Sequence, residues 1–336
     1  MKKHDDSTRN ADEMANKPML VRMICNIETG RWQDVLRFRC ADGTVKNELF
    51  DRAIFSNRRR LHEALLQLGA DIPKSATSAN PILDDIVEQT GATVDYVVSS
   101  NGWFEDDFVA GQVTYGSGRK PALSPLDPKS PLGLQKGDIK TYLAGLRPLL
   151  LRSRFARLGM ALQCSSVIWG KINRKESAIF HPFGDSGEGK SFCASIAMSI
   201  VGRAEKEDLG NHATSLAGFE RVLALLKNLL AIFDELGLTE DDSERVQVGK
   251  LVKMAFAFAS GHGRTLAASA WGVGIKSSTW HQYGLSTGEE SLQEIAQRCA
   301  IKLKPGLTRR WIDIPSFRPH LKEVSAMSSG TASCYR

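Results

Sequence analysis

The hydrophobic pattern of the amino-terminal third predicts a set of short strands with helices between them. Apolar and polar residues alternate loosely over residues 21–39, and Thr29-Gly30 stands where a hairpin between two strands would turn. Leucines then recur at three- and four-residue spacing over residues 61–68, which is the spacing of one helical face. Short apolar runs over residues 93–116 predict further strands. We therefore expect a small α+β domain over residues 21–115.

A proline-rich segment, residues 116–137, is predicted to be a linker, because its four prolines stand among serines and glycines. The next residues have a helical pattern that should split into two helices near Pro148. From there to about Pro315 the pattern alternates between strand and helix. This alternation favours a three-layer α/β domain around a mostly parallel sheet, over residues 138–320.

The composition is that of an ordinary globular protein, with 42% hydrophobic and 24% charged residues. The small and polar ends, residues 1–20 and 321–336, are predicted to be disordered tails. No run of 18 apolar residues occurs, and the amino end lacks the apolar core of a secretory signal. We expect a cytoplasmic protein without membrane contact. The six cysteines are scattered without a CxxC pair, which favours reduced thiols over a metal site.

The net charge of +6 permits a polyanionic partner such as nucleic acid but does not require one. Four arginines follow one another within three helical turns between Arg147 and Arg157. They could form the solvated face of a helix, or a track for nucleic-acid phosphates. The charge pattern alone leaves both interpretations open.

One loop carries the most specific chemical signal in the chain. The stretch GDSGEGKS fits the phosphate-binding pattern G-x-x-x-x-G-K-[ST] at every fixed position, and it lies between an apolar strand pattern and a helix pattern. Backbone N–H groups of such a loop can surround the phosphates of ATP, the lysine can reach the β- and γ-phosphates, and the serine hydroxyl can bind Mg²⁺. The predicted nucleotide-binding residues are Gly184, Asp185, Ser186, Gly187, Glu188, Gly189, Lys190 and Ser191.

Two acidic residues follow a second buried strand pattern, in the stretch LLAIFDEL. At the carboxyl end of a parallel strand, Asp234 would face the ligand crevice and hold Mg²⁺, as Ser191 does. Glu235 would polarise an attacking water as the general base. The 44 positions between Lys190 and Asp234 leave room for an extra strand, an arrangement that resembles the additional-strand, catalytic-glutamate ATPases. That resemblance implies a hydrolase or motor, and no signal for the acceptor pocket of a kinase is present.

Four further motifs flank this pair: SNGWFEDDFV, FASGHGR, LSTGEESL and TRRWIDIP. In this order they resemble the family called domain of unknown function 927, whose members are P-loop ATPases related to helicases and carried beside primases and helicases on bacterial mobile elements. The resemblance spans about Val21 to Pro315. Relatives usually continue with a helical region after the last strand, so we expect either a naturally short form or a truncated one.

The resemblance also implies roles for individual residues. Ser286 and Thr287 resemble a polar sensor for the γ-phosphate or the attacking water. The alternative is a helix N-cap, since Ser/Thr-x-x-Glu is a capping-box pattern, and both roles could hold together. Arg310 resembles an arginine that contacts a phosphate in cis or in trans, or it is a solvated strand arginine. Arg264, in the stretch SGHGR, is a weaker candidate, and the pattern favours a place at the tip of a hairpin instead.

Together these features predict an ATP-hydrolysing, nucleic-acid-associated ATPase, helicase-like or DNA-processing. Its expected ligands are ATP and Mg²⁺. Its expected partners are nucleic acid, further copies of itself, for which a ring is one arrangement, and a primase or helicase. The alternative is an ATP-gated scaffold or assembly switch without nucleic-acid contact.

Overall fold

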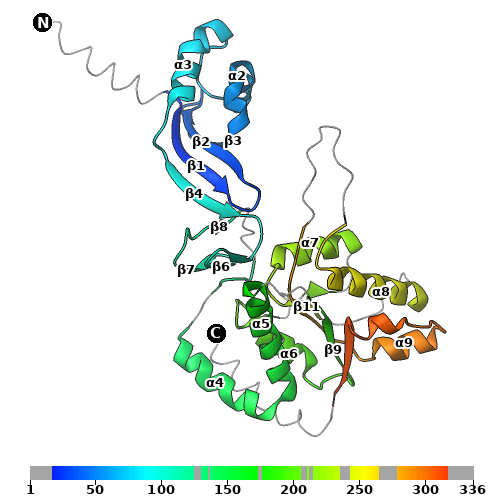
Figure 1. The fold of residues 1–336 in the computed structure, drawn as a ribbon. Coiled ribbons are helices and arrows are strands. Elements are labelled where there is room, and N and C mark those ends of the chain that lie inside the picture. Colours follow the sequence, from blue (N-terminus) through cyan, green and yellow to red (C-terminus); the bar gives the residue numbers. More distant parts are fainter. Residues whose placement is uncertain are drawn as a thin grey trace, which may run out of the picture. The chain divides into compact units, whose positions relative to one another are not determined.

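The computed structural model of the chain describes residues 17–124, 130–134, 137–172, 176–205, 210–211, 215–234, 243–264 and 278–316. They belong to two compact units, Met1–Ser99 and Ser100–Arg336, whose elements are drawn in Figure 1. The predicted tails fall almost wholly outside the described residues, except that Met19 and Leu20 begin the first strand.

The first unit is a mixed sheet with helices on one face. Its strands lie in the order β3-β2-β1-β4, antiparallel except for the parallel pair β1 and β4. The predicted hairpin is present, with Thr29 and Gly30 in its turn. Alternation along β2 directs Leu36 and Phe38 toward the helices, where they pack against Leu61 and Leu65. The elements are β1 (Met19–Asn26), β2 (Arg31–Arg39), β3 (Val45–Asp51), η1 (Arg52–Ser56), α2 (Arg58–Gln67), α3 (Ala76–Glu88) and β4 (Thr93–Val98).

The division between the units lies at Ser99, and not in the segment 116–137 as the prolines predicted. The antiparallel strands β5 (Gly102–Phe104), β6 (Asp107–Ala110) and β7 (Val113–Gly116) belong to the second unit. Backbone and side-chain amides of Asn101 both donate to the carbonyl of Leu225, and the indole of Trp103 donates to that of Val167. These long-range bonds hold the strands to the second unit, which local composition could not reveal.

The described part of the predicted linker also belongs to the second unit. The predicted linker contains strand β8 (Ala122–Leu123), and further along it Gly133 donates its amide to the carbonyl of Val201. Residues 125–129 and 135–136 lie outside the described residues.

The predicted helical pair is present, but the break is at Ser153 instead of Pro148. Helix α4 (Ile139–Arg152) contains Pro148, and α5 (Arg154–Lys171) starts after Ser153. Ser153 has an extended backbone and its hydroxyl accepts from the amide of Ala156, so it caps α5.

Within the described residues, the second unit has a five-stranded sheet in the order β10-β11-β12-β9-β13, and every neighbouring pair is parallel. This agrees with the predicted mostly parallel sheet of this domain; the sheets of the whole chain are mixed. The elements are β9 (Ile179–Phe183), α6 (Lys190–Met198), β10 (Gly210–Asn211), α7 (Leu216–Leu226), β11 (Ala231–Asp234), α8 (Glu244–Ser260), β12 (Gly284–Ser286), α9 (Leu292–Arg298), η3 (Pro305–Leu307) and β13 (Trp311–Pro315).

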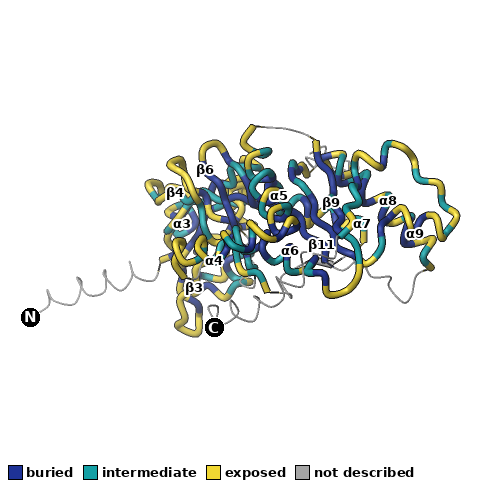
Figure 2. Tube along the Cα trace, turned by 90° about the horizontal axis from the view of Figure 1, so that it is seen from below, coloured by how far each residue is buried: buried dark blue, intermediate teal, exposed yellow. Residues whose placement is uncertain are grey.

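Helices cover both faces of this parallel sheet. Ala231 and Phe233 of β11 pack with α7, α8 and α9, whereas Leu230 and Ile232 pack with α5 and α6. A strand buried on both faces reads as a continuous apolar run, as LLAIF does. Figure 2 shows β9 and β11 among the buried residues.

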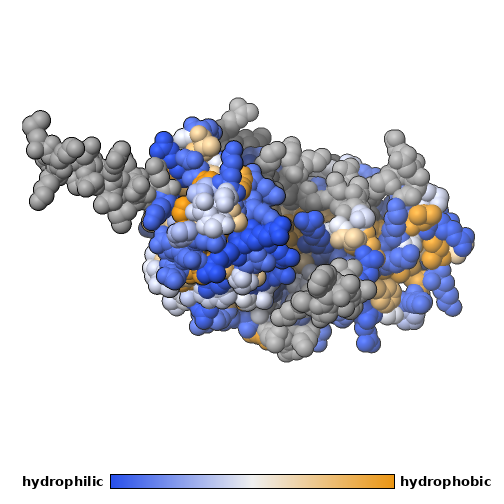
Figure 3. Space-filling view, turned by 90° about the horizontal axis from the view of Figure 1, so that it is seen from above, coloured by the Kyte–Doolittle hydropathy of each residue, from blue (hydrophilic) through white to orange (hydrophobic). Residues whose placement is uncertain are grey.

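In the parts of the chain that the structure describes, no helix is both long and apolar enough to cross a membrane. Among the residues coloured in Figure 3, hydrophilic side chains cover most of the face, and the hydrophobic areas are smaller.

Candidate functional site

The predicted phosphate loop connects the end of β9 to the start of α6. Phe183 is the last residue of the strand and Lys190 the first of the helix, so the loop is in the strand, loop and helix setting that the motif requires. Gly184 and Gly189 have φ values of 147° and 81°, where an L side chain would be strained. The loop leads directly into the amino terminus of α6, where backbone N–H groups and the helix dipole favour an anion.

Lys190 lies folded across the loop. Its Nζ donates to the carbonyl oxygens of Gly184 at 2.9 Å and Asp185 at 2.8 Å, and the residue is only 8% exposed. Burial lowers the pKa of Lys190, and the nearby carboxylates of Glu188, Glu289 and Asp234 oppose this shift. The ammonium group is thus held at the loop, at the position from which it could meet a bound phosphate.

Asp234 joins three elements into one cluster of oxygen atoms. Its Oδ1 accepts from Ser191 Oγ at 2.8 Å and from Thr287 Oγ1 at 2.5 Å. Asp234 and Thr287 are buried, with exposures of 6% and 2%. The structure therefore brings together three residues that the sequence places up to 96 positions apart. Glu235 lies outside the described residues.

Parallel strand order explains why these side chains meet. Asp234 ends β11 and Thr287 follows β12, its neighbour in the sheet, and the amide of Thr287 donates to the carbonyl of Phe233. The carboxyl ends of neighbouring parallel strands lie at one edge, where open α/β sheets bind ligands. Carboxylate and hydroxyl oxygens are also the donors that Mg²⁺ prefers, so Ser191 and Asp234 fit that ion.

The helix cap that could have explained Thr287 is made by another residue. Ser291 is the N-cap of α9, and it forms a reciprocal capping box with Glu294. The alternative of Ser286 or Thr287 as the capping residue is therefore wrong. The hydroxyl of Thr287 is bonded to Asp234 instead.

The two predicted arginines do not join this cluster. Arg310 precedes β13, and its carbonyl accepts from the amide of Ile179 at the start of β9, so it lies at the amino edge of the sheet. Its guanidinium donates to the carbonyl of Gly306 and lies over the ring of Phe256. The length of strand β9, about 16 Å, separates Arg310 from the phosphate loop. Arg310 therefore lies at the wrong edge of the sheet to contact a phosphate bound by the loop of its own chain. Arg264 pairs with Glu220 of α7.

Sequence reasoning missed two polar residues at this edge, His181 and Ser316, and the bonds that they make to the predicted Ser286 and Glu188. His181 and Ser286 are fully buried and hydrogen-bonded to each other, and Glu188 contacts the hydroxyl of Ser316, whose amide donates to Phe183. A histidine inside a buried parallel strand, in the stretch IFHPF, was an available signal. Its partner could be known only from strand order.

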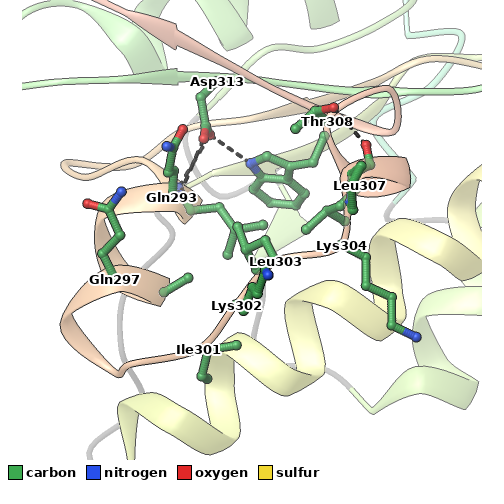
Figure 4. A pocket seen from close by; sticks show the side chains of 13 residues that line it. Gln293, Gln297, Ile301, Lys302, Leu303, Lys304, Leu307, Thr308 and Asp313 are labelled. Atoms are coloured by element: carbon green, nitrogen blue, oxygen red, sulfur yellow. Dashed lines mark hydrogen bonds between the residues drawn. The ribbon is translucent and has the colours of Figure 1, made fainter.

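Two hollows lie along α9 and β13. One, of about 340 Å³, has the Trp311 indole in its wall, and Asp313 accepts from that indole and from the amide of Gln293 (Figure 4). The other, of about 370 Å³, opens at the carboxyl ends of β9 and β13, beside Phe183 and Pro315. No residue of the phosphate loop lines either hollow.

Comparison with protein families gives a direct assignment. Residues 1–280 match the model described as "Domain of unknown function (DUF927)". The chain belongs to the DUF927 family. No curated protein matches this DUF927 chain.

Solved structures show what the DUF927 chain resembles in three dimensions. One, described as "SCCmec type IV Cch - active helicase", has a TM-score of 0.59 and 18% sequence identity, covering 93% of this chain and 57% of that one. At this identity the likeness shows the fold alone, and this chain spans little more than half of that protein's length. The apo structure of the NrS-1 C-terminal region has 11% identity and a TM-score of 0.35, too low to support an argument, over 90% of this chain and 59% of that one.

Proposed function

We propose that this protein is a Mg²⁺-dependent ATPase with a P-loop NTPase sandwich as its second unit, and that it acts on or beside nucleic acid. The observation that carries the proposal is the convergence of Lys190, Ser191, Asp234 and Thr287 around a G-x-x-x-x-G-K-S loop at the carboxyl edge of a parallel sheet. A loop of this sequence occurs by chance, but its combination with a buried aspartate and threonine from two neighbouring strands is the arrangement that phosphate transfer needs.

Each residue then has a distinct role. The loop amides and Lys190 bind the β- and γ-phosphates, and the hydroxyl of Ser191 with the carboxylate of Asp234 would hold Mg²⁺. That ion, when bound, neutralises charge on the phosphates. Thr287 orients the γ-phosphate side of the site, since its hydroxyl lies against Asp234. Glu235 follows Asp234 directly in the chain, and we propose it as the general base on the sequence alone.

Three observations support a nucleic-acid partner. Residues 139–171, which include α4 and α5, contain six lysines and arginines and no aspartate or glutamate. Arg147, Arg152, Arg154 and Arg157 are all exposed. The protein of similar fold is described as an active helicase. We propose that this surface contacts phosphates without reading sequence, and that a primase or helicase is a further partner.

The position of Arg310 at the amino edge favours a contact in trans over one in cis, if this arginine acts on a phosphate. Such an arrangement needs a second copy of the chain, as in a ring, so we propose a homo-oligomer as the active form. Turnover per chain should then rise with protein concentration.

ATP turnover by the full chain, measured with and without single- or double-stranded DNA, tests the proposal. We expect turnover that requires Mg²⁺ and rises with DNA. Turnover that ignores DNA at low salt would favour the ATP-gated assembly switch. Absence of ATP binding would contradict both.

A further inference from the structure

A buried histidine bridges the two ends of the segment that carries Thr287. His181 of β9 is 0% exposed. Its Nδ1 lies 2.8 Å from Ser286 Oγ, and its Nε2 lies 3.0 Å from the carbonyl oxygen of Glu290. One side chain therefore contacts both the residue before Thr287 and the residue three positions after it.

The chemistry of these two contacts determines which ring nitrogen carries the proton. A carbonyl oxygen can only accept, so Nε2 donates to Glu290. Burial lowers the pKa of His181, which favours the neutral ring, although the Asp313 carboxylate opposes the shift. In the neutral ring Nδ1 is an acceptor, and the hydroxyl of Ser286 donates to it. Both ring nitrogens are satisfied, each by a different end of the segment.

The ring itself is fixed by packing. It stacks on Phe183 with 9° between the planes, and it lies 5.1 Å from the ring of Trp311. The backbone next to it is fixed as well, because Gly288 donates to the carbonyl of Pro182. A histidine held on three sides is a rigid support for the groups that it bonds.

We propose that His181 is a positioning residue, which holds Ser286 and the Glu290 carbonyl so that the Thr287 hydroxyl between them stays on Asp234. The inference rests on the proposed ATPase function, since Thr287 matters for turnover only if the site works on a nucleotide. His181 does not touch the proposed phosphates or metal. Its effect passes through Thr287, and it should change the rate of turnover more than the binding of ATP.

Three substitutions separate the two contacts. His181→Asn keeps an acceptor near Nδ1, His181→Gln can place a donor near Nε2, and His181→Phe keeps the ring packing but loses both bonds. We expect His181→Phe to lower kcat by up to about tenfold, no more than the loss of the Thr287 hydroxyl itself, with each of the other variants less affected and KM within about twofold. The matched control is His62→Asn, because His62 is also buried and bonds a backbone carbonyl, that of Pro73, in the first unit.

A double-mutant comparison tests the route through Thr287. In a Thr287→Ala background, His181→Asn should slow turnover further by less than about twofold, because the group that it positions is gone. Equal slowing in both backgrounds would overturn the inference. So would a His181→Phe protein that folds and turns over ATP like the parent.

Hydrogen exchange gives a readout that needs no activity. The amides of Thr287 and Gly288 donate to Phe233 and Pro182, and both should exchange about tenfold faster in His181→Asn than in the parent or in His62→Asn. Unchanged exchange would overturn the positioning role even if the parent proved not to hydrolyse ATP. Absence of turnover in the parent with faster exchange in the variant would contradict the proposed function alone.

Discussion

Polar side chains at the two edges of the parallel sheet differ in their burial and in the partners that they bond. At the carboxyl edge, Asp234 and Thr287 are buried and bonded to each other, and the exposed Ser191 donates its hydroxyl to the same carboxylate. At the amino edge, Arg310 is half-buried and bonded to a loop carbonyl, and its charge lies over an aromatic ring. Burying polar groups costs free energy unless they are bonded, so a buried polar cluster has to be built as a set. We infer that, within one chain, the carboxyl edge is organised for chemistry and the amino edge for packing.

The largest expected difference between the two edges is in ATP affinity, when one lysine is replaced at each edge. Lys190→Ala removes the charge beside the loop, and we expect ATP affinity to fall by more than about 100-fold. Lys302→Ala removes an exposed lysine between α9 and β13, and affinity should stay within about twofold. Calorimetric titration of folded proteins measures both. Equal ATP affinities of the two variants would mean that the loop is not part of the ATP-binding site.

The second prediction separates binding from turnover. Glu235→Gln keeps the shape of the side chain and removes the base, so turnover should fall by about 100-fold while ATP still binds. Because Glu235 lies outside the described residues, this expectation rests on its place after Asp234. A steady-state rate combined with an ATP titration gives the answer, and a normal rate would mean that another group is the base.

A smaller change is expected at Thr287. Thr287→Ala deletes the hydroxyl that donates to Asp234 and should slow turnover by about tenfold. Thr308→Ala is the matched control, because Thr308 is exposed at the other edge and bonds the carbonyl of Pro305. If both variants turn over ATP alike, Thr287 has only a structural role.

The smallest expected effect concerns nucleic acid. Reversing Arg152 and Arg154 to glutamate should weaken DNA binding by about fivefold and reduce the slope of log affinity against log salt by about two. The control reverses Arg58 and Arg59, which pair with Asp84 and Glu63 in the first unit. Titration at several salt concentrations compares the three proteins. Identical slopes would mean that the α4 and α5 arginines are a solvated helix face.

Local pattern was sufficient for the elements that carry the site. The loop from Gly184 to Ser191 and the apolar run before Asp234 each consist of consecutive residues, so the sequence predicts both. The structure contains the strand and helix that flank the loop, and the strand that ends at Asp234. The helix after Thr287 was also predictable. Its capping residue is Ser291 and not Ser286 or Thr287, because LSTGEESLQE contains three Ser/Thr-x-x-Glu patterns and only the last one caps the helix.

Long-range pairing was beyond sequence reasoning. The link between His181 and Ser286 spans 105 positions and depends on β9 lying next to β12. The edge on which Arg310 lies depends on where β13 joins the sheet. The division at Ser99 depends on Asn101 and Trp103 bonding residues far along the chain. In each case the deciding contact joins segments that no local pattern relates.

The linkage between ATP and Mg²⁺ tests the central claim most directly. ATP affinity should be measured by calorimetry with Mg²⁺ and with a chelator, for the parent and for Asp234→Asn. If Asp234 and Ser191 form the metal side of the site, Mg²⁺ should tighten ATP binding in the parent by about tenfold or more, and this gain should disappear in Asp234→Asn while the metal-free affinity remains. An Asp234→Asn protein that keeps the full gain would contradict the site.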